Sequence, residues 1–208
     1  MSDVSGHPGP GLTEADLGPD PIARFRAWLE DARSAGIAFP EAAALATADP
    51  QGRPGVRHVL VKDVSDLGFA FFTNRESRKG RHLAENPHAS LAFLWREIDR
   101  QVCVTGIATA MGEEASLAYF RTRSREARIG AWASQQSRPV ASREELDAAY
   151  AEMAERFPTQ DIPLPPHWGG YQLAPLTIEF WKGREHRLHD RFRFTREGEG
   201  WTVTRLWP

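Results

Sequence analysis

Residues 42–74, AAALATADPQGRPGVRHVLVKDVSDLGFAFFTN, alternate short apolar segments with turn residues. Ala42–Ala48 is small and apolar, and the following Asp49-Pro50-Gln51-Gly52 has the composition of a tight turn. Val56–Lys62 and Gly68–Thr73 are rich in β-branched or aromatic residues, which favour strands. We therefore expect three short strands joined by turns, as in an antiparallel sheet.

Helix and strand patterns continue on both sides of this region. Asp20-Pro21 is typical of a helix start and Gly36 of its end, and an apolar stripe between them predicts core packing. Further helices are expected from Ser77 to Asn86-Pro87, at about Glu113–Thr122 and at about Arg125–Ala133. Another is expected to begin at Ser142, because Ser142 and Glu145 form a capping box. The apolar face of this last helix consists of Leu146, Tyr150, Met153 and Phe157. Further strands are expected at Ala89–Trp95, Gln101–Met111, Gly170–Leu173, Thr177–Trp181, Leu188–Thr195 and Trp201–Leu206.

This element order predicts a mainly β fold, an antiparallel barrel with helices around it. We expect one domain over residues 12–208, preceded by a flexible arm at Met1–Gly11 that is rich in glycine and proline. The 208 residues carry a net charge of −2, which argues against a nucleic-acid binder. A single cysteine, no membrane-length apolar run and no signal-peptide pattern lead us to expect a cytoplasmic protein. No metal-binding spacing, dinucleotide fingerprint or P-loop is present.

The first candidate anion site is Thr73-Asn74-Arg75-Glu76-Ser77-Arg78-Lys79, between a strand and a helix start. Unpaired N–H groups at a helix N-terminus attract phosphate, whereas Arg and Lys in the first turn oppose the helix dipole. A bound anion would relieve that conflict. Considered alone, however, the segment favours the simpler interpretation that Arg78 and Lys79 are solvated surface charges.

Two further pairs of residues are weak signals when each is taken singly. Arg57 and Lys62 flank an apolar strand, where they could bind an anion or simply point to water from the strand ends. Tyr119 and Arg123 are four residues apart on a predicted helix, so both can point at the same spot. A partly buried tyrosine beside a solvated arginine is the commoner arrangement of such a pair.

A stronger signal comes from Arg187, His189 and Arg191, which recur at period two. In a strand at Leu188–Thr195 they would share one face, where like charges repel unless an anion or a carboxylate neutralises them. Trp181 lies upstream, and an aromatic plane beside Arg and His suits a planar phosphorylated ligand. The alternative is a surface strand whose cations form ion pairs with Glu179 or Asp190, and the pattern does not choose between the two.

Taken together, these segments resemble the pyridoxamine 5′-phosphate oxidase family. The resemblance runs from about Leu12 to Pro208, and so many motifs in one order do not arise by chance. The matching strings are Arg57-x-Val59-Leu60-x-Lys62, Phe72-Thr73-Asn74, Ser77-Arg78-Lys79, Arg100-Gln101-Val102, Ile129-Gly130-Ala131-Trp132, Gln136-Ser137, Trp168-Gly169-Gly170, Glu179-Phe180-Trp181 and Glu185-His186-Arg187-Leu188-His189-Asp190-Arg191-Phe192.

The resemblance implies a split β-barrel homodimer with FMN bound at the subunit interface. Residues implied for the FMN site are Arg57, His58, Val59, Leu60, Val61, Lys62, Phe72, Thr73, Arg78, Lys79, Gln101, Gln136, Ser137, Trp181 and Arg191. Residues implied for the substrate are Lys62, Tyr119 and Arg123 as a phosphate clamp, with Arg187, Leu188 and His189 over the pyridine ring. Arg187 and His189 are the implied catalytic residues, and no metal is implied.

The implied reaction is oxidation of pyridoxamine or pyridoxine 5′-phosphate to pyridoxal 5′-phosphate, with O₂ reduced to hydrogen peroxide. The cofactor performs the redox chemistry, and the protein orients the reactants.

Several positions depart from the family pattern. Ala127 stands where a clamp serine is expected, Phe72 replaces a tyrosine, and His58 replaces an aliphatic residue. The expected Arg and Tyr of the N-terminal arm are missing from Met1–Gly11. With these differences, the resemblance supports the flavin site better than it supports the vitamin B6 substrate.

Two rival functions are considered. One is a related oxidase of the phenazine-biosynthesis type, to which the segment Leu94-Trp95-Arg96-Glu97 is slightly similar. Lys62, Tyr119 and Arg123 are retained, however, and they favour a phosphorylated substrate. The other is a flavin-binding or storage protein without activity, which would not need Arg187 and His189.

Overall fold

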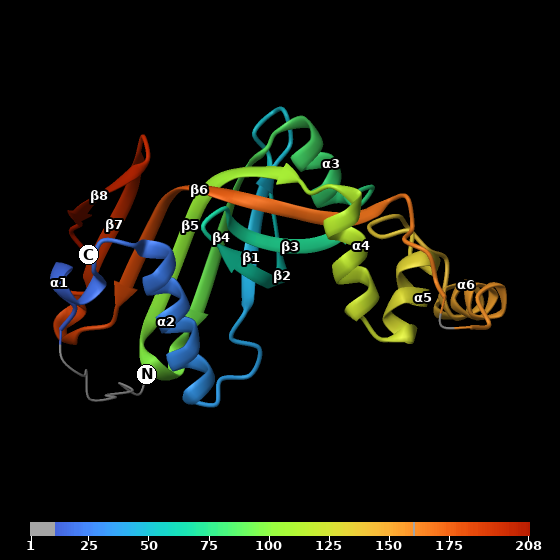
Figure 1. Cartoon of the computed structure of the whole chain (residues 1–208), viewed down its shortest axis with the longest axis horizontal. Helices are drawn as coiled ribbons and strands as arrows, with labels where there is room; N and C mark the ends of the chain where they lie inside the picture. Colours follow the sequence, from blue (N-terminus) through green and yellow to red (C-terminus); the bar gives the residue numbers. More distant parts are fainter. Residues whose placement is uncertain (1–10, 160) are drawn as a thin grey trace.

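The computed structural model describes residues 11–159 and 161–208, so the arm predicted at Met1–Gly11 lies, except for Gly11, outside the described residues. Within them the chain forms eight strands and six α-helices (Figure 1). The strands are β1 (Ala42–Ala48), β2 (Pro54–Ser65), β3 (Gly68–Asn74), β4 (His88–Trp95), β5 (Arg100–Ala110), β6 (Trp168–Lys182), β7 (Asp190–Glu197) and β8 (Gly200–Arg205). The helices are α1 (Glu14–Leu17), α2 (Pro21–Ser34), α3 (Arg78–Glu85), α4 (Glu113–Thr122), α5 (Arg125–Ala133) and α6 (Arg143–Arg156).

The strands form one antiparallel sheet that closes into a barrel of six strands. Their order is β3-β2-β1-β4-β5-β6-β7-β8, and an additional pairing of β3 with β6 closes the barrel. Residues 168–173 of β6 pair with β3, whereas residues 177–182 pair with β7, and β5 pairs along the other edge of β6 from residue 171 to residue 182. Pro175 lies between the two halves of β6, where a missing N–H is tolerated because the strand is changing partners.

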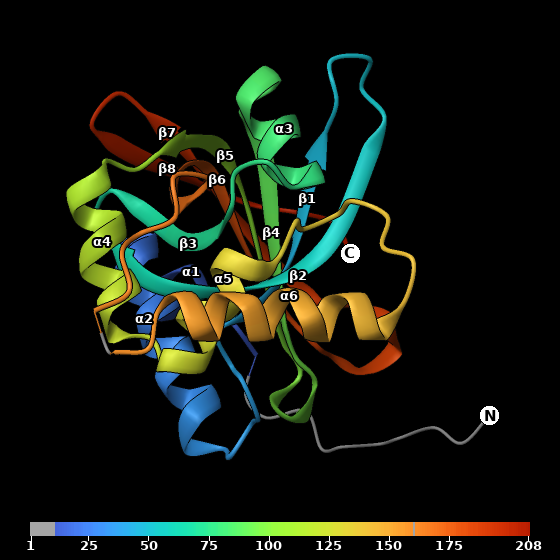
Figure 2. The ribbon, with the colours of Figure 1, turned by 90° about the vertical axis from the view of Figure 1, so that its right-hand side faces the viewer.

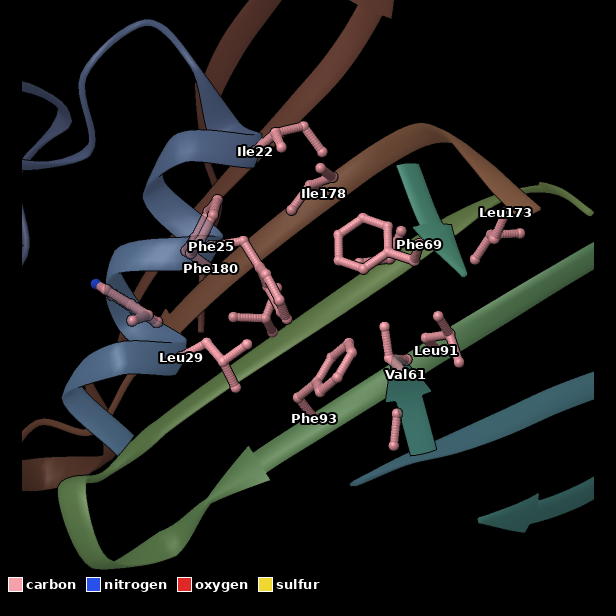
Figure 3. Packing of buried hydrophobic residues seen from close by; sticks show 14 of the residues in the cluster. Ile22, Phe25, Leu29, Val61, Phe69, Leu91, Phe93, Leu173, Ile178 and Phe180 are labelled. Carbon is pink, nitrogen blue, oxygen red and sulfur yellow. The ribbon is translucent and has the colours of Figure 1, made fainter. Parts of the chain in front are cut away.

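The core lies inside the barrel and beneath helix α2 (Figure 3). Asp20 caps this helix by accepting the N–H groups of Ile22 and Ala23, and Pro21 occupies its first turn. Phe25 is fully buried and contacts Phe69 and Phe93 edge to face, with ring centroids 4.9 and 4.7 Å apart. The apolar stripe predicted for this helix is therefore confirmed as core packing.

Helices α4, α5 and α6 form a separate layer at the far end of the molecule from β7 and β8 (Figure 1). Figure 2 shows α5 and α6 lying side by side in front of the barrel. A second apolar cluster holds α4 and α5 to the start of β6 through the buried Phe120, Ile129 and Trp168. Helix α6 has no buried residue, and Leu146 on its predicted apolar face is 44% exposed. Among the described residues, no helix has the length and apolar character needed to cross a membrane.

Most predicted elements are confirmed to within a few residues, and the helices at Glu113–Thr122 and Arg125–Ala133 match at both ends. Two predicted strands, Gly170–Leu173 and Thr177–Trp181, are wrong as separate elements because β6 is continuous. The capping box predicted at Ser142 forms only in part: Ser142 accepts the Glu145 N–H, but the Glu145 carboxylate accepts from Ala141.

The predicted strand Leu188–Thr195 is wrong at its start. A 3₁₀ turn covers Glu185–Arg187, in which His186 and Arg187 have left-handed backbone angles (φ 55° and 61°), and β7 begins only at Asp190. Arg187 and His189 therefore do not share a strand face with Arg191, contrary to the expectation from period two.

Candidate functional site

A cavity of about 660 Å³ opens between the barrel and the helical layer. Strands β2 and β3 form one side, helices α3, α4 and α5 supply others, and the start of β6 contributes Trp168. Its lining residues are Arg57, His58, Val59, Leu60, Lys62, Phe72, Thr73, Asn74, Lys79, Tyr119, Arg123, Ala127, Gly130, Ala131, Ser134, Gln136 and Trp168. Four of these side chains are cationic and none is acidic, so the cavity is suited to bind anions.

Three cations, Arg57, Lys79 and Arg78, lie close together at the β2 side of the cavity, although Arg78 is not a lining residue. A Cβ added to Gly55 would lie 2.9 Å from Arg57 Nη2 and 3.7 Å from Arg78 Cζ, which places both guanidinium groups around one point. Burial and the charge of Arg78 lower the pKa of Arg57. Within the described part of the chain, the hydrogen-bond partners of Arg57 are the Leu45 carbonyl and the Thr47 hydroxyl, both neutral. Like charges held together without a carboxylate fit a phosphate group.

Lys79 is the most buried cation of the cavity, at 8% exposure. Its Nζ donates to Gln136 Oε1 at 2.7 Å, Thr73 Oγ1 at 3.0 Å and Ser77 Oγ at 3.3 Å, all neutral oxygens. Burial, followed by the charge of Arg57, lowers the pKa of Lys79 from 10.5 to about 8. The interpretation of Lys79 as a solvated surface charge is therefore wrong, whereas Arg78 is exposed.

The local fold of helix α3 places Lys79 in the cavity. Ser77 caps the helix by accepting the Gly80 N–H, which fixes the first turn beside the end of β3. A Cβ at Gly80 would lie 2.0 Å from the Arg75 carbonyl oxygen, so this close approach requires glycine. The predicted helix start at Ser77 is confirmed, and its N-terminus lies beside the three cations.

A second group of cavity residues combines aromatic rings with a buried guanidinium. Phe72 and Tyr119 stack with centroids 3.9 Å apart, and Trp168 lies nearly parallel to both. Arg123 Cζ lies 4.9 Å from the Trp168 ring centroid, a cation–π distance. Arg123 Nη1 is buried and has no hydrogen-bond partner, and burial lowers the pKa of Arg123. A buried donor of this kind is satisfied by an anionic ligand.

Lys62 also faces the cavity, with its Nζ 3.5 Å from Glu41 Oε1. Tyr119 and Arg123, predicted to point at one spot, both line this cavity. Ala127 lies there as well, without the hydroxyl group expected at that position.

The remaining predicted site residues lie away from this cavity. Gln101, Trp181 and Arg191 face one another across β5, β6 and β7, in register. Arg191 forms an ion pair with Glu179 at 2.8 Å, as expected from the alternative interpretation in which the cations of this segment pair with carboxylates. Val61 packs in the barrel core, and Ser137 is exposed beside Gln136 with a φ of 73°.

Arg187, Leu188 and His189 occupy the turn between β6 and β7. Arg187 and Leu188 are exposed, and the His189 ring lies 4.6 Å from that of Trp181. The Arg184 N–H donates to His189 Nδ1 at 3.1 Å. In the neutral imidazole this bond leaves the proton on Nε2, which makes Nε2–H a donor.

Trp168 and Ser134 line the cavity but were not among the predicted site residues, and Asn74, which also lines it, was singled out only within the candidate anion site Thr73–Lys79. Asn74 donates from Nδ2 to the Ser134 carbonyl at 3.2 Å, joining β3 to the segment after α5. These residues are brought together by tertiary packing over 60 positions of sequence, which no local pattern reports. In the described residues, no group of three or more His, Cys, Asp and Glu side chains could hold a metal ion.

The chain is similar to known proteins over most of its length. Residues 29–157 match the family model "Pyridoxamine 5′-phosphate oxidase", and residues 168–208 match "Pyridoxine 5′-phosphate oxidase C-terminal dimerisation region". A pyridoxine/pyridoxamine 5′-phosphate oxidase of Rubrobacter xylanophilus is 51% identical over 95% of this chain and 91% of that protein. The corresponding protein of Anaeromyxobacter dehalogenans is 54% identical over 91% of this chain and 96% of its own.

Two solved structures are also similar. PhzG from Burkholderia lata, in complex with tetrahydrophenazine-1-carboxylic acid, has a TM-score of 0.90 and 36% identity over 98% of this chain and all of that one. A pyridoxamine 5′-phosphate oxidase-related, FMN-binding protein from Nostoc punctiforme has a TM-score of 0.74 at 19% identity, over 88% of this chain and 97% of that one; it supports the fold.

Proposed function

The chain belongs to the pyridoxamine 5′-phosphate oxidase family of FMN-dependent oxidases, and from this premise we propose that it oxidises pyridoxine or pyridoxamine 5′-phosphate to pyridoxal 5′-phosphate. Pyridoxine phosphate and O₂ would give the aldehyde and hydrogen peroxide, whereas pyridoxamine phosphate would also consume water and release ammonia. FMN, when bound, supplies the two-electron oxidation by accepting a hydride from the substrate C4′ and passing the electrons to O₂.

The observation that carries this proposal is a cavity with four cations, no acidic side chain and an aromatic wall. Arg57, Arg78 and Lys79 would hold the phosphate of FMN, because they converge without a carboxylate. Gln136 already accepts a hydrogen bond from Lys79, so it would orient the ammonium group toward that phosphate. Thr73 contributes the same way from the end of β3.

Lys62, Tyr119 and Arg123 would hold the phosphate of the substrate. The unpartnered Nη1 of Arg123 supports this role, since a phosphate oxygen would satisfy it. Ala127 offers no hydroxyl group, so the clamp would bind with one hydrogen bond fewer than a serine would allow, a difference of about 1 kcal/mol. Phe72 and Trp168 would form the adjoining aromatic surface.

Arg187 and His189 would act at the substrate ring from a second subunit. Trp168 at the cavity and Trp181 beside His189 lie thirteen residues apart on β6, which is about 43 Å along the strand at roughly 3.3 Å per residue. Figure 1 likewise shows β7 and β8 at the opposite end of the molecule from α4 and α5. A two-fold partner can bring the two groups together, and the match of residues 168–208 to a dimerisation region supports this.

In that dimer His189 would donate from Nε2 to the substrate or flavin, because its Nδ1 already accepts the Arg184 N–H. Arg187 is exposed and has a left-handed backbone conformation. Residues 12–208 would then form one domain, with Leu12 tied to the turn through a hydrogen bond to Asp190.

The rival substrate is a non-phosphorylated tricyclic acid, as the likeness to PhzG suggests. The four-residue likeness at Leu94–Glu97 does not support it, since Trp95 is buried and donates to the Pro40 carbonyl away from the cavity. The cationic clamp of Lys62 and Arg123 favours a phosphate group over a single carboxylate.

A turnover assay of FMN-loaded protein separates these substrates. We expect pyridoxine 5′-phosphate to give both hydrogen peroxide and the absorbance of pyridoxal 5′-phosphate, with pyridoxine itself as the unphosphorylated control. Turnover of tetrahydrophenazine-1-carboxylic acid without any reaction of pyridoxine 5′-phosphate would reject the proposed substrate.

Hybrid dimers test the shared site. Arg123→Met damages the cavity and Arg187→Ala damages the turn, so each variant alone should have little activity. If each site takes one group from each subunit, an equal mixture after subunit exchange should recover about a quarter of the wild-type activity, because half of the dimers are hybrids with one intact site. No recovery, with exchange verified by mass spectrometry, would show that one chain supplies both groups.

A further inference from the structure

Arg57 is held by neutral groups on the neighbouring strand. Its Nη1 donates to the Thr47 hydroxyl at 2.7 Å and to the Leu45 carbonyl at 3.1 Å, and β1 and β2 pair in register at Leu45 and Arg57. Thr47 is 3% exposed, so its hydroxyl group is shielded from water and requires protein partners. The position of the Arg57 guanidinium therefore depends in part on the orientation of one buried hydroxyl group.

His82 determines that orientation from helix α3. Its Nδ1 lies 3.1 Å from Thr47 Oγ1, and its side chain is 7% exposed. Because Arg57 donates to Oγ1, the one hydroxyl proton of Thr47 remains available for His82 Nδ1. With the hydroxyl proton of Thr47 placed on this bond, the three groups form a directed chain in which Arg57 donates to Thr47 and Thr47 donates to His82.

We propose that His82 is a positioning residue that acts through Thr47 to hold Arg57 in place for the phosphate of FMN. The proposal rests on the FMN-binding role proposed above for Arg57. It explains why a neutral residue occupies a place where a carboxylate would bind a guanidinium more strongly. A carboxylate beside Arg57 would cancel the positive charge that the phosphate requires, whereas an imidazole fixes the geometry and leaves the charge intact.

The chain also explains how Arg57 stays beside other cations. The guanidinium lies close to Arg78, and Arg57 also lowers the pKa of Lys79, so repulsion favours rotation of the flexible side chain away from them. Two hydrogen bonds to fixed acceptors oppose that rotation before the ligand binds. His82 and Lys79 share helix α3, three residues apart, so the same helix would position two of the phosphate-binding cations.

FMN titration of the apoprotein, followed by flavin fluorescence, tests this role without depending on turnover. His82→Leu should raise the Kd for FMN about fivefold, the effect of one lost hydrogen bond, and Thr47→Val about as much. His82→Gln should stay within about twofold of wild type, because its amide oxygen can accept the Thr47 hydroxyl proton. His88→Leu, at an exposed position at the start of β4, is the matched control and should leave the Kd unchanged.

A double-mutant cycle separates positioning from general structural damage. Once Arg57→Met has removed the guanidinium, adding His82→Leu should have no further effect on the Kd. Additive effects, an unchanged Kd in His82→Leu, or equal losses in His82→Gln and His82→Leu would each overturn the proposal. If His82→Leu fails to fold, the comparison of Thr47→Ser with Thr47→Val replaces it. The Kd for FMN should stay near the wild-type value in Thr47→Ser, which keeps the hydroxyl group, and should rise in Thr47→Val. Failure of the wild type to bind FMN would instead reject the function proposed for the site.

Discussion

The affinity of the apoprotein for FMN should fall as the pH rises above 8. Lys79 has a pKa of about 8 rather than 10.5, because it is buried and lies near Arg57. A bound phosphate would supply the missing counter-charge and return the pKa toward its ordinary value. Below pH 8 the ammonium group is charged in both the free and the bound protein, so pH has no effect through this group. Above pH 8 the free protein loses the proton, and FMN binding must take it up again.

The size of the effect follows from this linkage. If the pKa of Lys79 in the complex is at least 10.5, the Kd should rise about twofold at pH 8 and about tenfold at pH 9, relative to neutral pH. Proton uptake per bound FMN should increase over the same range and approach one. The second ionisation of a phosphate monoester lies near pH 6, so a series that begins at pH 7 isolates the lysine.

Fluorescence titration from pH 7 to 9.5 at constant ionic strength measures the Kd, and calorimetry in two buffers of different ionisation enthalpy measures the proton uptake. Lys79→Arg is the matched control, because a guanidinium stays charged throughout and the Kd should not change with pH, even if binding is weaker. A wild-type Kd that is constant from pH 7 to 9.5, or an equal slope in Lys79→Arg, would refute the reasoning.

Three further substitutions probe the site and its support. Arg123→Met should raise the KM for pyridoxine 5′-phosphate about 10- to 100-fold in steady-state kinetics, because a charge-assisted hydrogen bond is lost. Arg121→Met, on the exposed side of α4, should leave the KM unchanged. Equal effects of the two substitutions would contradict the proposed phosphate clamp. Gly55→Ala should weaken FMN binding several-fold in fluorescence titration, because its Cβ would lie 2.9 Å from Arg57 Nη2, whereas Gly200→Ala, with ordinary space, serves as the control. Asp190→Asn should lower the free energy of unfolding, measured by chemical denaturation, by about 3 kcal/mol. The reason is that this buried carboxylate binds the Leu12 N–H and the Arg184 and Arg205 side chains. A change no larger than that of Asp66→Asn, at an exposed position, would contradict the prediction.

The fold was largely predictable because its strands and caps have local signals. Asp20 and Ser77 begin helices through side-chain hydrogen bonds that involve residues within three positions. Pro175 was misleading, since proline normally interrupts a strand, and only the change of partner from β3 to β7 makes it acceptable inside β6. Left-handed backbone angles at His186 and Arg187 likewise have no sequence signal, because such angles favour glycine or asparagine.

The sequence predicted which residues lie at the site better than it predicted their burial and their partners. Sequence reasoning found the cations at Arg57, Lys79 and Arg123, but the pattern around Lys79 favoured a solvated charge. One of its hydrogen-bond partners, Gln136, lies 57 residues away, and long-range contacts of this kind are invisible to local patterns. For Arg191 the sequence allowed either a bound anion or an ion pair with a nearby carboxylate, and the structure contains the ion pair with Glu179.

The length of β6 has a consequence for the proposed dimer. If one strand carries a wall of one site at Trp168 and part of the other site near Trp181, two-fold pairing completes both sites together or neither. FMN would then contact both subunits, and any ligand that binds only the dimer stabilises it by RT ln(1 + [L]/Kd) for each site. In such a dimer, cofactor binding and subunit association would be one coupled equilibrium, and a substitution that weakens either process would weaken the other, even when it lies far from the flavin.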